Sequence, residues 1–246
     1  MSRRPRMASG PALSRPIRWD VVLKPGGGAR RLVVLSRVDA LAFGRSVAGV
    51  SPAILGALGS ESHANRVVEW DPARWPILEP WRRARRRWQR DLRRLGNDAR
   101  YAAVTDVRAC YASISPSVMS DRLLALGAPE AGAHQIGSWL HVFGDLGVDG
   151  LPVGPAASAL LADAVLSAGD DAIRATGAAH VRWVDDVAIF APDARTRAAA
   201  LEALRRTWAA LGLELHDGKT ALLDEPDGGA PLEAASQSLT ASSTLR

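Results

Sequence analysis

The chain contains a single cysteine, scattered histidines and no long hydrophobic run, and each shortage excludes a class of protein. One cysteine, Cys110, cannot form an internal disulfide, and the five histidines form no Cys/His cluster with zinc-binding spacing. No stretch approaches the ~18 consecutive apolar residues of a membrane span, and the basic N-terminus lacks the apolar core of an export signal. We therefore expect a soluble, cytoplasmic protein with no membrane partner, in which Cys110 is a small buried filler.

Lysine is nearly absent as well: only Lys24 and Lys219 occur among the 31 basic residues, and the rest are arginines. Such a bias is typical of a genome-wide preference. The two lysines remain of interest because lysine can release a proton in a tuned environment, whereas arginine keeps its charge. The formal net charge is +5 and the basic residues cluster, which favours an anionic partner such as nucleic acid.

Hydrophobic periodicity predicts an α+β fold in 246 residues, a length that can bury a full core. The segment 17–39 predicts a β-hairpin with a basic tip, and residues 213–223 a second hairpin turned at Asp217-Gly218. We expect a small antiparallel sheet covered by helices on one face. Other predicted elements are a strand at 101–107, a hairpin at 180–191, and helices at 117–127, 154–177 and 193–212. Four regions follow: a disordered basic arm at 1–14, a fingers-like region at 15–99, a catalytic palm at 100–223 and a disordered tail at 224–246.

The segment "PWRRARRRWQRDLRRL", residues 80–95, predicts an amphipathic helix with a strongly basic outer side. Repulsion between like charges destabilises an isolated helix, so this density favours an anion lying against it. The alternative is a solvated face in an arginine-biased protein. The apolar stripe comprises Trp81, Ala84, Trp88, Leu92 and Leu95, and the candidate nucleic-acid contacts are Arg85, Arg86, Arg90 and Arg93.

Two adjacent aspartates interrupt the apolar hairpin "HVRWVDDVAIFAPD", residues 180–193. Burying such a pair without compensation costs several kcal/mol for each charge, so Asp185 and Asp186 are either exposed in the turn or neutralised. A third carboxylate, Asp106, ends the strand "YAAVTD" and can lie beside the hairpin tip. Oxygen ligands suit hard divalent cations, so the three carboxylates predict a site for a pair of Mg²⁺ ions.

These segments together resemble the palm motifs of reverse transcriptases. "TDVRACYASI" looks like the first motif, "GLPVGPAASALLA" the second, "RWVDDVAIF" the aromatic-x-Asp-Asp hairpin, and "LGLELHDGKT" the fourth motif with its lysine. The basic hairpin "LKPGGGARRLVVLS" is similar to that of the family's fingers. The motifs stand in the family's order, and the resemblance covers about residues 18–223. It implies right-hand polymerase fingers and palm without an evident thumb.

The resemblance implies a role for each matching residue. Asp106 and Asp185 would hold Mg²⁺ or Mn²⁺ with Asp186 assisting, and Lys219 would protonate the leaving pyrophosphate or order its turn. Tyr111 would lie under the sugar and exclude a 2′-hydroxyl, unless it is a core aromatic. The other implied nucleotide-binding positions are Lys24, Arg31, Val107, Arg108, Val153 and Gly154.

Three features depart from the family's pattern: Trp183 replaces the usual tyrosine, Val153 replaces the usual glutamine, and little chain follows the fourth motif. The amino-acid sequences of the second motif and the Asp-Asp hairpin are most similar to those of bacterial reverse transcriptase-like proteins of abortive infection and phage defence. That similarity implies an RNA-directed DNA polymerase acting on an RNA template or a DNA or RNA primer, with a partner chain or second copy supplying the thumb. The alternatives are another palm enzyme, such as an RNA polymerase or nucleotide cyclase, and a weak or inactive nucleic-acid-binding subunit of a larger complex.

Overall fold

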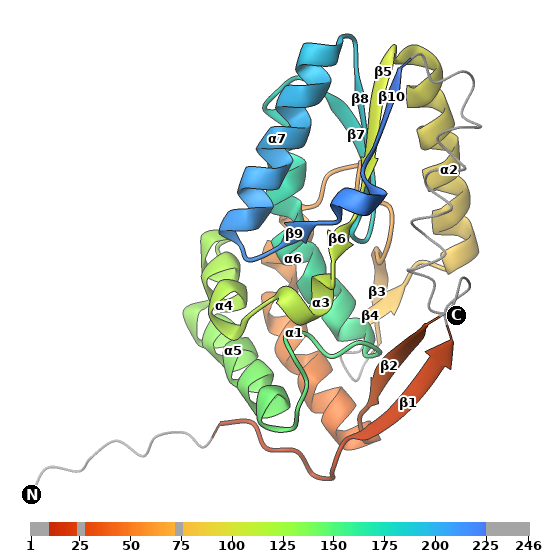
Figure 1. Cartoon of the computed structure of the whole chain (residues 1–246). Helices are drawn as coiled ribbons and strands as arrows, with labels where there is room; N and C mark the ends of the chain where they lie inside the picture. Colours follow the sequence, from red (N-terminus) through yellow and green to blue (C-terminus); the bar gives the residue numbers. More distant parts are fainter. Residues whose placement is uncertain (1–9, 24–27, 72–75, 225–246) are drawn as a thin grey trace, which may run out of the picture.

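A four-stranded antiparallel sheet forms the centre of the computed structural model, which describes residues 10–23, 28–71 and 76–224 (Figure 1). The strand order is β10-β5-β8-β7. The strands are β5 (Tyr101–Thr105), β7 (Ala179–Trp183), β8 (Asp186–Ala191) and β10 (Ala221–Asp224). All six residues of β8 are buried because it is a central strand with helices over both faces.

Helices cover both faces of this sheet. On one face, α6 (Ala156–Arg174) and α7 (Ala194–Ala210) pack against Ala103, Val187 and Ile189. On the other face, α2 (Trp81–Asp98) packs Ala84, Trp88 and Leu92 against the sheet residues whose side chains point to that face. Those sheet residues are Ala102, Val104, Val181, Trp183, Ala188 and Phe190. The period-2 alternation of side chains thus separates the core into two layers.

Most of the remaining elements lie below the sheet in Figure 1. Two separate hairpins are formed by β1 (Arg18–Leu23) with β2 (Ala29–Val34), and by β3 (Val67–Trp70) with β4 (Pro76–Leu78). The short strands β6 (Val107–Arg108) and β9 (Glu214–Leu215) pair with each other, and η1 (Asp217–Lys219) follows β9. The other helices are α1 (Arg37–Ala57), α3 (Cys110–Ser113), α4 (Pro116–Ala125) and α5 (Glu130–Asp145).

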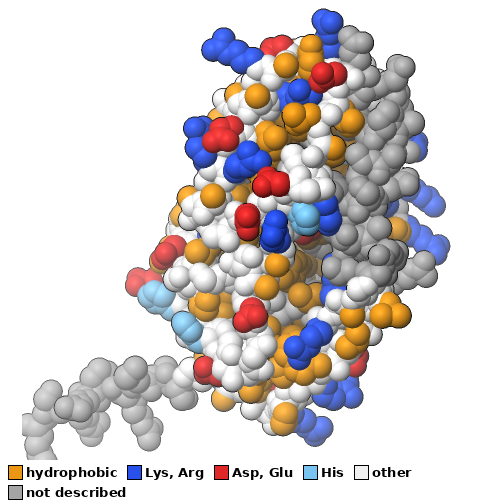
Figure 2. Space-filling view, viewed as in Figure 1, with side chains coloured by type: hydrophobic (Ala, Val, Ile, Leu, Met, Phe, Trp, Pro, Cys, Tyr) orange, Lys and Arg blue, Asp and Glu red, His pale blue; other side chains and the backbone are white. Residues whose placement is uncertain are grey.

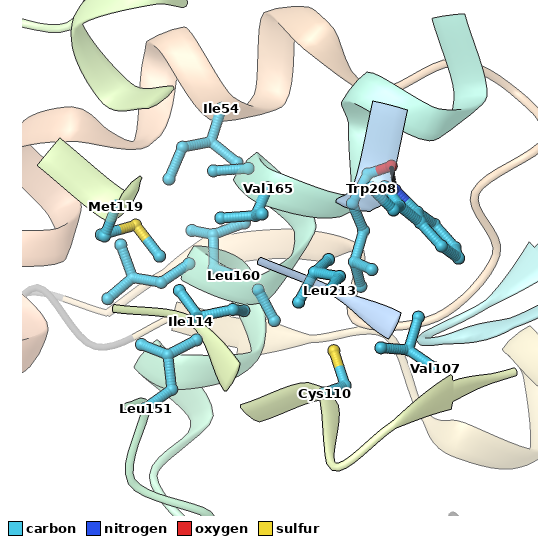
Figure 3. Close-up of a cluster of buried hydrophobic side chains, with 14 of the residues drawn as sticks. Ile54, Val107, Cys110, Ile114, Met119, Leu151, Leu160, Val165, Trp208 and Leu213 are labelled. Carbon is cyan, nitrogen blue, oxygen red and sulfur yellow. Dashed lines mark hydrogen bonds between the residues drawn. The ribbon is translucent and has the colours of Figure 1, made fainter. Parts of the chain in front are cut away.

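The larger hydrophobic cluster joins these helices to the sheet. Figure 3 shows side chains from α1, α4, α6 and α7 converging on Cys110, Ile114 and Leu151. Cys110 is buried there, which confirms its expected role as a filler, and burial raises the pKa of its thiol well above the usual value. One helix among the described residues, α1, is long and apolar enough to cross a membrane by length and composition alone. In this fold four of its apolar residues lie in the core: Phe43, Val47, Val50 and Ile54.

The structure confirms the α+β class and corrects two expectations. Helices lie on both faces of the sheet, because the apolar stripe of α2 needs a partner and the second face of the sheet supplies it. The segment 213–223 is not a hairpin: Leu215 of β9 pairs with Val107, whereas β10 pairs with β5. β9 and β10 are instead joined through η1, and they pair with two consecutive strands of the chain, β6 and β5 respectively. The ends beyond residues 10 and 224 lie outside the described residues.

Candidate active site

The β7–β8 hairpin presents its two aspartates differently. Trp183 and Asp186 form the last pair of the ladder, so Val184 and Asp185 make a two-residue connection. Val184 has φ +57°, a left-handed conformation that is rare for a β-branched residue and costs on the order of 1–3 kcal/mol. As a result Asp185 lies at the tip, whereas Asp186 begins β8 and is buried.

A fully buried arginine, Arg182, holds this strained turn from beneath. Its Nη1 donates to the carbonyl oxygen of Val184 at 2.9 Å and to Oδ1 of Asp163 at 2.7 Å. Its Nε and Nη2 donate to both oxygens of Asp170, and Nη2 also donates to the hydroxyl of Ser62 at 3.0 Å. The guanidinium thereby uses all five of its N–H donors.

The two acidic partners of Arg182 are not equivalent. Burial raises the pKa of Asp163, and one of its oxygens has no hydrogen-bond partner within the described part of the chain. Although burial also acts on Asp170, its contacts with Arg182 and His180 hold its pKa below the usual value. Asp170 is therefore the firm counter-ion of Arg182, and Asp163 the weaker one.

Asp106 lies at the junction of β5 and β6, next to the aspartate hairpin. The β5–β8 register pairs Thr105 with Val187, and its continuation places Asp106 beside Asp186 on the sheet face that α2 covers. Oδ2 of Asp106 accepts a 2.6 Å hydrogen bond from Nζ of Lys219, and its backbone oxygen accepts from the amide of His216. The sheet therefore brings together the three carboxylates and the lysine that the sequence singled out.

The carboxylates repel one another in a partly buried setting. Burial first, and then the neighbouring Asp106, raise the pKa of Asp185 to about 6. Burial, Asp185 and Asp106 raise the pKa of Asp186 well above its usual value. Oδ1 of Asp106 and both side-chain oxygens of Asp186 are buried and have no hydrogen-bond partner among the residues described. Unpartnered carboxylate oxygens clustered in this way fit the ligand preference of Mg²⁺ or Mn²⁺.

A second acidic group lies behind the turn, where Glu61, Asp170 and His180 bring ligand atoms within 4.8 Å of one another. Each of its carboxylates already has an arginine partner: Asp170 binds Arg182, and Glu61 binds Arg174. Two guanidinium groups beside this group would repel a cation. It is better explained as the ionic support of the hairpin, and the unpartnered carboxylates at the turn are the stronger metal candidates.

A cavity of about 780 Å³ opens beside the carboxylates and gathers most of the predicted site. The predicted residues among its lining are Asp106, Val107, Arg108, Tyr111, Val153, Gly154, Asp185 and Lys219. Arg31 is not part of this lining. Its guanidinium instead packs over the ring of Trp19 on the neighbouring strand β1, 4.0 Å from the ring centroid. The adjacent Arg30 lines the cavity instead, as alternation along β2 requires. Lys24 lies outside the described residues.

The loop 150–154 connects the cavity wall to the basic hairpin. Leu151 donates its amide to the carbonyl oxygen of Tyr111, and the carbonyl oxygen of Val153 accepts a 2.7 Å hydrogen bond from the amide of Val33 in β2. At Gly154, with φ +129°, a Cβ atom would lie 2.8 Å from the carbonyl oxygen of Val33. The glycine therefore permits the close approach that fixes β1–β2 against this loop, and Arg30 reaches the cavity from there.

The arginines of α2 divide between the surface and the interior. Arg86, Arg90 and Arg93 are exposed or partly exposed, as a nucleic-acid contact requires. Arg85 is half-buried, and its guanidinium lies 4.1 Å from the ring centroid of Trp88 and 5.4 Å from that of Trp183. The structure thus places Arg85 in the aromatic layer beside the hairpin. Figure 2 shows acidic, basic and histidine side chains intermingled on the viewed face.

The helix α2 is fixed to the preceding loop through a buried histidine. Arg87 donates from Nε to Nδ1 of His63 at 3.2 Å and from Nη2 to its backbone oxygen at 2.9 Å. Burial and the positive charge of Arg87 lower the pKa of His63 to about 4. His63 in turn donates its amide to the backbone oxygen of Arg182, so α2, this loop and the hairpin form one connected unit.

Sequence reasoning missed four residues that line or support the site, namely Arg30, Arg182, Asp163 and Asp170. A signal was present for Arg182, because a single arginine within the apolar run "HVRWV" must find buried counter-charges. Its partners on α6 are separated from it by up to 19 residues, and only the folded chain identifies them.

Comparisons with known proteins give a family match and a structural match. A family model described as reverse transcriptase (RNA-dependent DNA polymerase) matches residues 64–231. Among solved structures, a telomerase from Candida albicans in complex with the TWJ fragment of telomeric RNA matches with a TM-score of 0.56 and 14% sequence identity. The match covers 84% of this chain and 41% of the telomerase chain, so this chain spans less than half of that neighbour's length. At this identity the likeness shows a shared fold. A search of curated proteins found no match.

Proposed function

The chain belongs to the reverse transcriptase family of RNA-directed DNA polymerases, and from this premise we propose that it adds deoxynucleotides to a nucleic-acid 3′-hydroxyl by a two-metal mechanism. The observation that carries the proposal is the set of three carboxylates beside a cavity of nucleotide size, two of them with buried oxygens that find no partner among the described residues. Their mutual repulsion has no structural benefit, since a pair of exposed turn residues would serve a hairpin equally well.

Each residue around the cavity has a proposed task. Asp106 and Asp185 would hold the divalent ions, with Asp186 as the supporting carboxylate. Bound Mg²⁺ or Mn²⁺ would activate the attacking hydroxyl and neutralise charge on the leaving pyrophosphate. Lys219, which donates a hydrogen bond to Asp106, would donate a proton or a hydrogen bond to that leaving group. Tyr111 lines the cavity where it can contact the sugar.

The phosphates of the nucleotide would meet a basic wall. We propose Arg30 for this contact in place of Arg31, because Arg30 lines the cavity. Val107 and Arg108 line the same space, and Val153 lines it with an apolar residue where the family usually has a polar one. We also retain as proposals the fingers-like region at 15–99, the palm at 100–223, and a partner chain or second copy that completes the grip on nucleic acid.

The biological setting is a proposal that rests on the amino-acid sequences of the motifs. The sequence around "LPVGP" and "WVDD" resembles bacterial reverse transcriptase-like proteins of phage defence, so we propose a cytoplasmic role in antiviral defence. Phage plaque counts on cells that express the wild type or Asp185→Asn test it. Equal protection by both proteins would contradict a role for polymerisation in defence.

The activity is tested by incorporation of labelled deoxynucleotides on a primed RNA template with Mg²⁺ or Mn²⁺. Asp185→Asn and Asp106→Asn should each abolish incorporation while the protein stays folded. Asp145→Asn, which changes an exposed carboxylate at the end of α5, is the matched control and should be fully active. Undiminished incorporation by folded Asp185→Asn would refute the site assignment. Binding of a primed template without incorporation by the wild type would favour the alternative of an inactive binding subunit.

A further inference from the structure

A row of three indole rings leads from the interior to the edge of the cavity. Trp88 and Trp183 are buried, with ring centroids 6.0 Å apart. Trp81, the first residue of α2, meets Trp183 edge-to-face at 6.2 Å and 89°. The Trp81 side chain is 48% exposed and lines the same cavity as Asp106 and Asp185.

Packing does not account for the position of Trp81. Helical spacing placed it on the apolar stripe with Ala84 and Trp88, yet both of those are buried and Trp81 is not. Because the ring is half exposed to water, the fold lacks much of the stabilisation that full burial of a large apolar side chain would give. The ring is nevertheless ordered by its contact with Trp183 and by its place on the helix, so a ligand that stacked on it would restrict few additional rotamers.

The register of the sheet places Trp81 on the same side as the reacting groups. Trp183 and Asp186 form one cross-strand pair, and Asp106 continues the same face, which is the face that α2 covers. The first turn of α2 therefore lies at the end of the sheet where the carboxylates stand. A nucleic-acid strand that occupies the cavity is therefore within reach of the Trp81 ring, which lines it.

We propose that Trp81 is a stacking platform for a nucleobase of the nucleic acid that occupies the cavity. The proposal rests on the proposed function, because that function supplies the strand. An indole face suits any base, and each such stack typically strengthens binding by about 5- to 150-fold. Exposed Arg82 and Arg86 on the same helix have the charge that adjoining phosphates require, which favours nucleic acid over an apolar protein partner.

Fluorescence anisotropy of a labelled primer–template with the full chain, in Ca²⁺ to prevent turnover, measures the contribution of the ring. Trp81→Ala should weaken binding at least about 5-fold and Trp81→Phe should retain most of the affinity, because a smaller ring still stacks. Leu146→Ala is the matched control: Leu146 is similarly exposed, lies after α5 outside the cavity lining, and should leave binding unchanged.

The stacked base is located by placing 2-aminopurine at successive positions of each strand. At one position the wild type should quench its fluorescence and Trp81→Ala should not. An abasic residue at that position should then bind the wild type and Trp81→Ala equally. Unchanged affinity of Trp81→Ala, in a wild type that binds and extends the primer, would refute the platform and leave the polymerase function standing. A shift of Trp81→Ala in oligomeric state by light scattering, with unchanged affinity for the oligonucleotide, would equally overturn it in favour of a protein contact. If the wild type neither binds nor extends, it is the proposed function that fails.

Discussion

Replacing Arg182 by methionine should separate the stability of the hairpin from its catalytic geometry. The substitution keeps a long side chain and leaves Asp163 and Asp170 buried without their guanidinium. Removing one partner of a buried ion pair costs about 3–5 kcal/mol. For a chain of this size that reduction in stability lowers Tm by roughly 6–20 °C. Arg174→Met is the control: it breaks half-exposed contacts with Glu61 and Asp171 and should cost about 1 kcal/mol or less.

A triple variant, Arg182→Met with Asp163→Asn and Asp170→Asn, removes the charges on both sides. Most of the stability should return, because the destabilisation comes chiefly from uncompensated buried charge. The hydrogen bond to the carbonyl oxygen of Val184 does not return. The strained turn is then free to relax, and the affinity for Mn²⁺, measured by titration calorimetry, should fall at least about 10-fold, as is typical when the residues that support metal ligands are changed.

Two results would refute this reasoning. Arg182→Met as stable as Arg174→Met in urea denaturation would show that the guanidinium is not a central support of the fold. Full recovery of both stability and Mn²⁺ affinity in the triple variant would show that Arg182 does not position the turn. Circular dichroism on each variant establishes that the comparison is made between folded proteins.

Three further predictions follow from single side chains or small groups of them. Because the pKa of His63 is about 4 in the folded chain against an ordinary 6.5, the unfolded chain binds more protons in this range, and stability should fall as the pH drops from 6.5 towards 4. The slope reaches about 1.4 kcal/mol per pH unit, and urea titrations of His63→Gln should lack this component. Tyr111→Ala should raise the use of ribonucleotides relative to deoxyribonucleotides, and an unchanged ratio in competition assays would return Tyr111 to a core role. Neutralising Arg86, Arg90 and Arg93 together should weaken binding to all nucleic-acid sequences. The slope of log affinity against log salt concentration should decrease in magnitude by about 0.9 for each phosphate that these arginines neutralise in the wild type. An unaltered slope would place the nucleic acid elsewhere.

The sequence predicted those parts of the site that lie on strongly patterned elements. Asp106 ends an apolar strand and Asp185 interrupts an apolar hairpin, so both could be identified from local pattern, and the structure brings them to one end of the sheet. The predicted helices 154–177 and 193–212 are close to the observed α6 and α7 for the same reason. Local periodicity suffices where an element has one buried face and clear ends.

Prediction failed where long-range pairing decides the outcome. Alternation alone distinguishes Arg30 from Arg31 but does not say which faces the cavity, and only the folded chain places Arg30 in the cavity lining. The residues 213–223 had the turn chemistry of a hairpin, yet their partners are β6 and β5, more than 100 residues away. Arg85, predicted as a nucleic-acid contact, lies half-buried over Trp88 and Trp183, because it borders the apolar stripe of α2 and the hairpin supplies a second indole ring.

Three consecutive residues of the β7–β8 turn each depart from ordinary packing. Val184 has a positive φ, Asp185 has a raised pKa, and Asp186 buries both carboxylate oxygens without a partner among the described residues. Each is unfavourable by itself, and they persist because Arg182 ties the turn to α6 on one side and to Ser62 on the other. A run of adjacent residues that are each locally unfavourable is expected where a protein places its chemistry. The buried ionic network around Arg182 thus offsets the unfavourable free energy of the aspartate pair. The residues that hold the site in place are therefore ones that no reacting group touches.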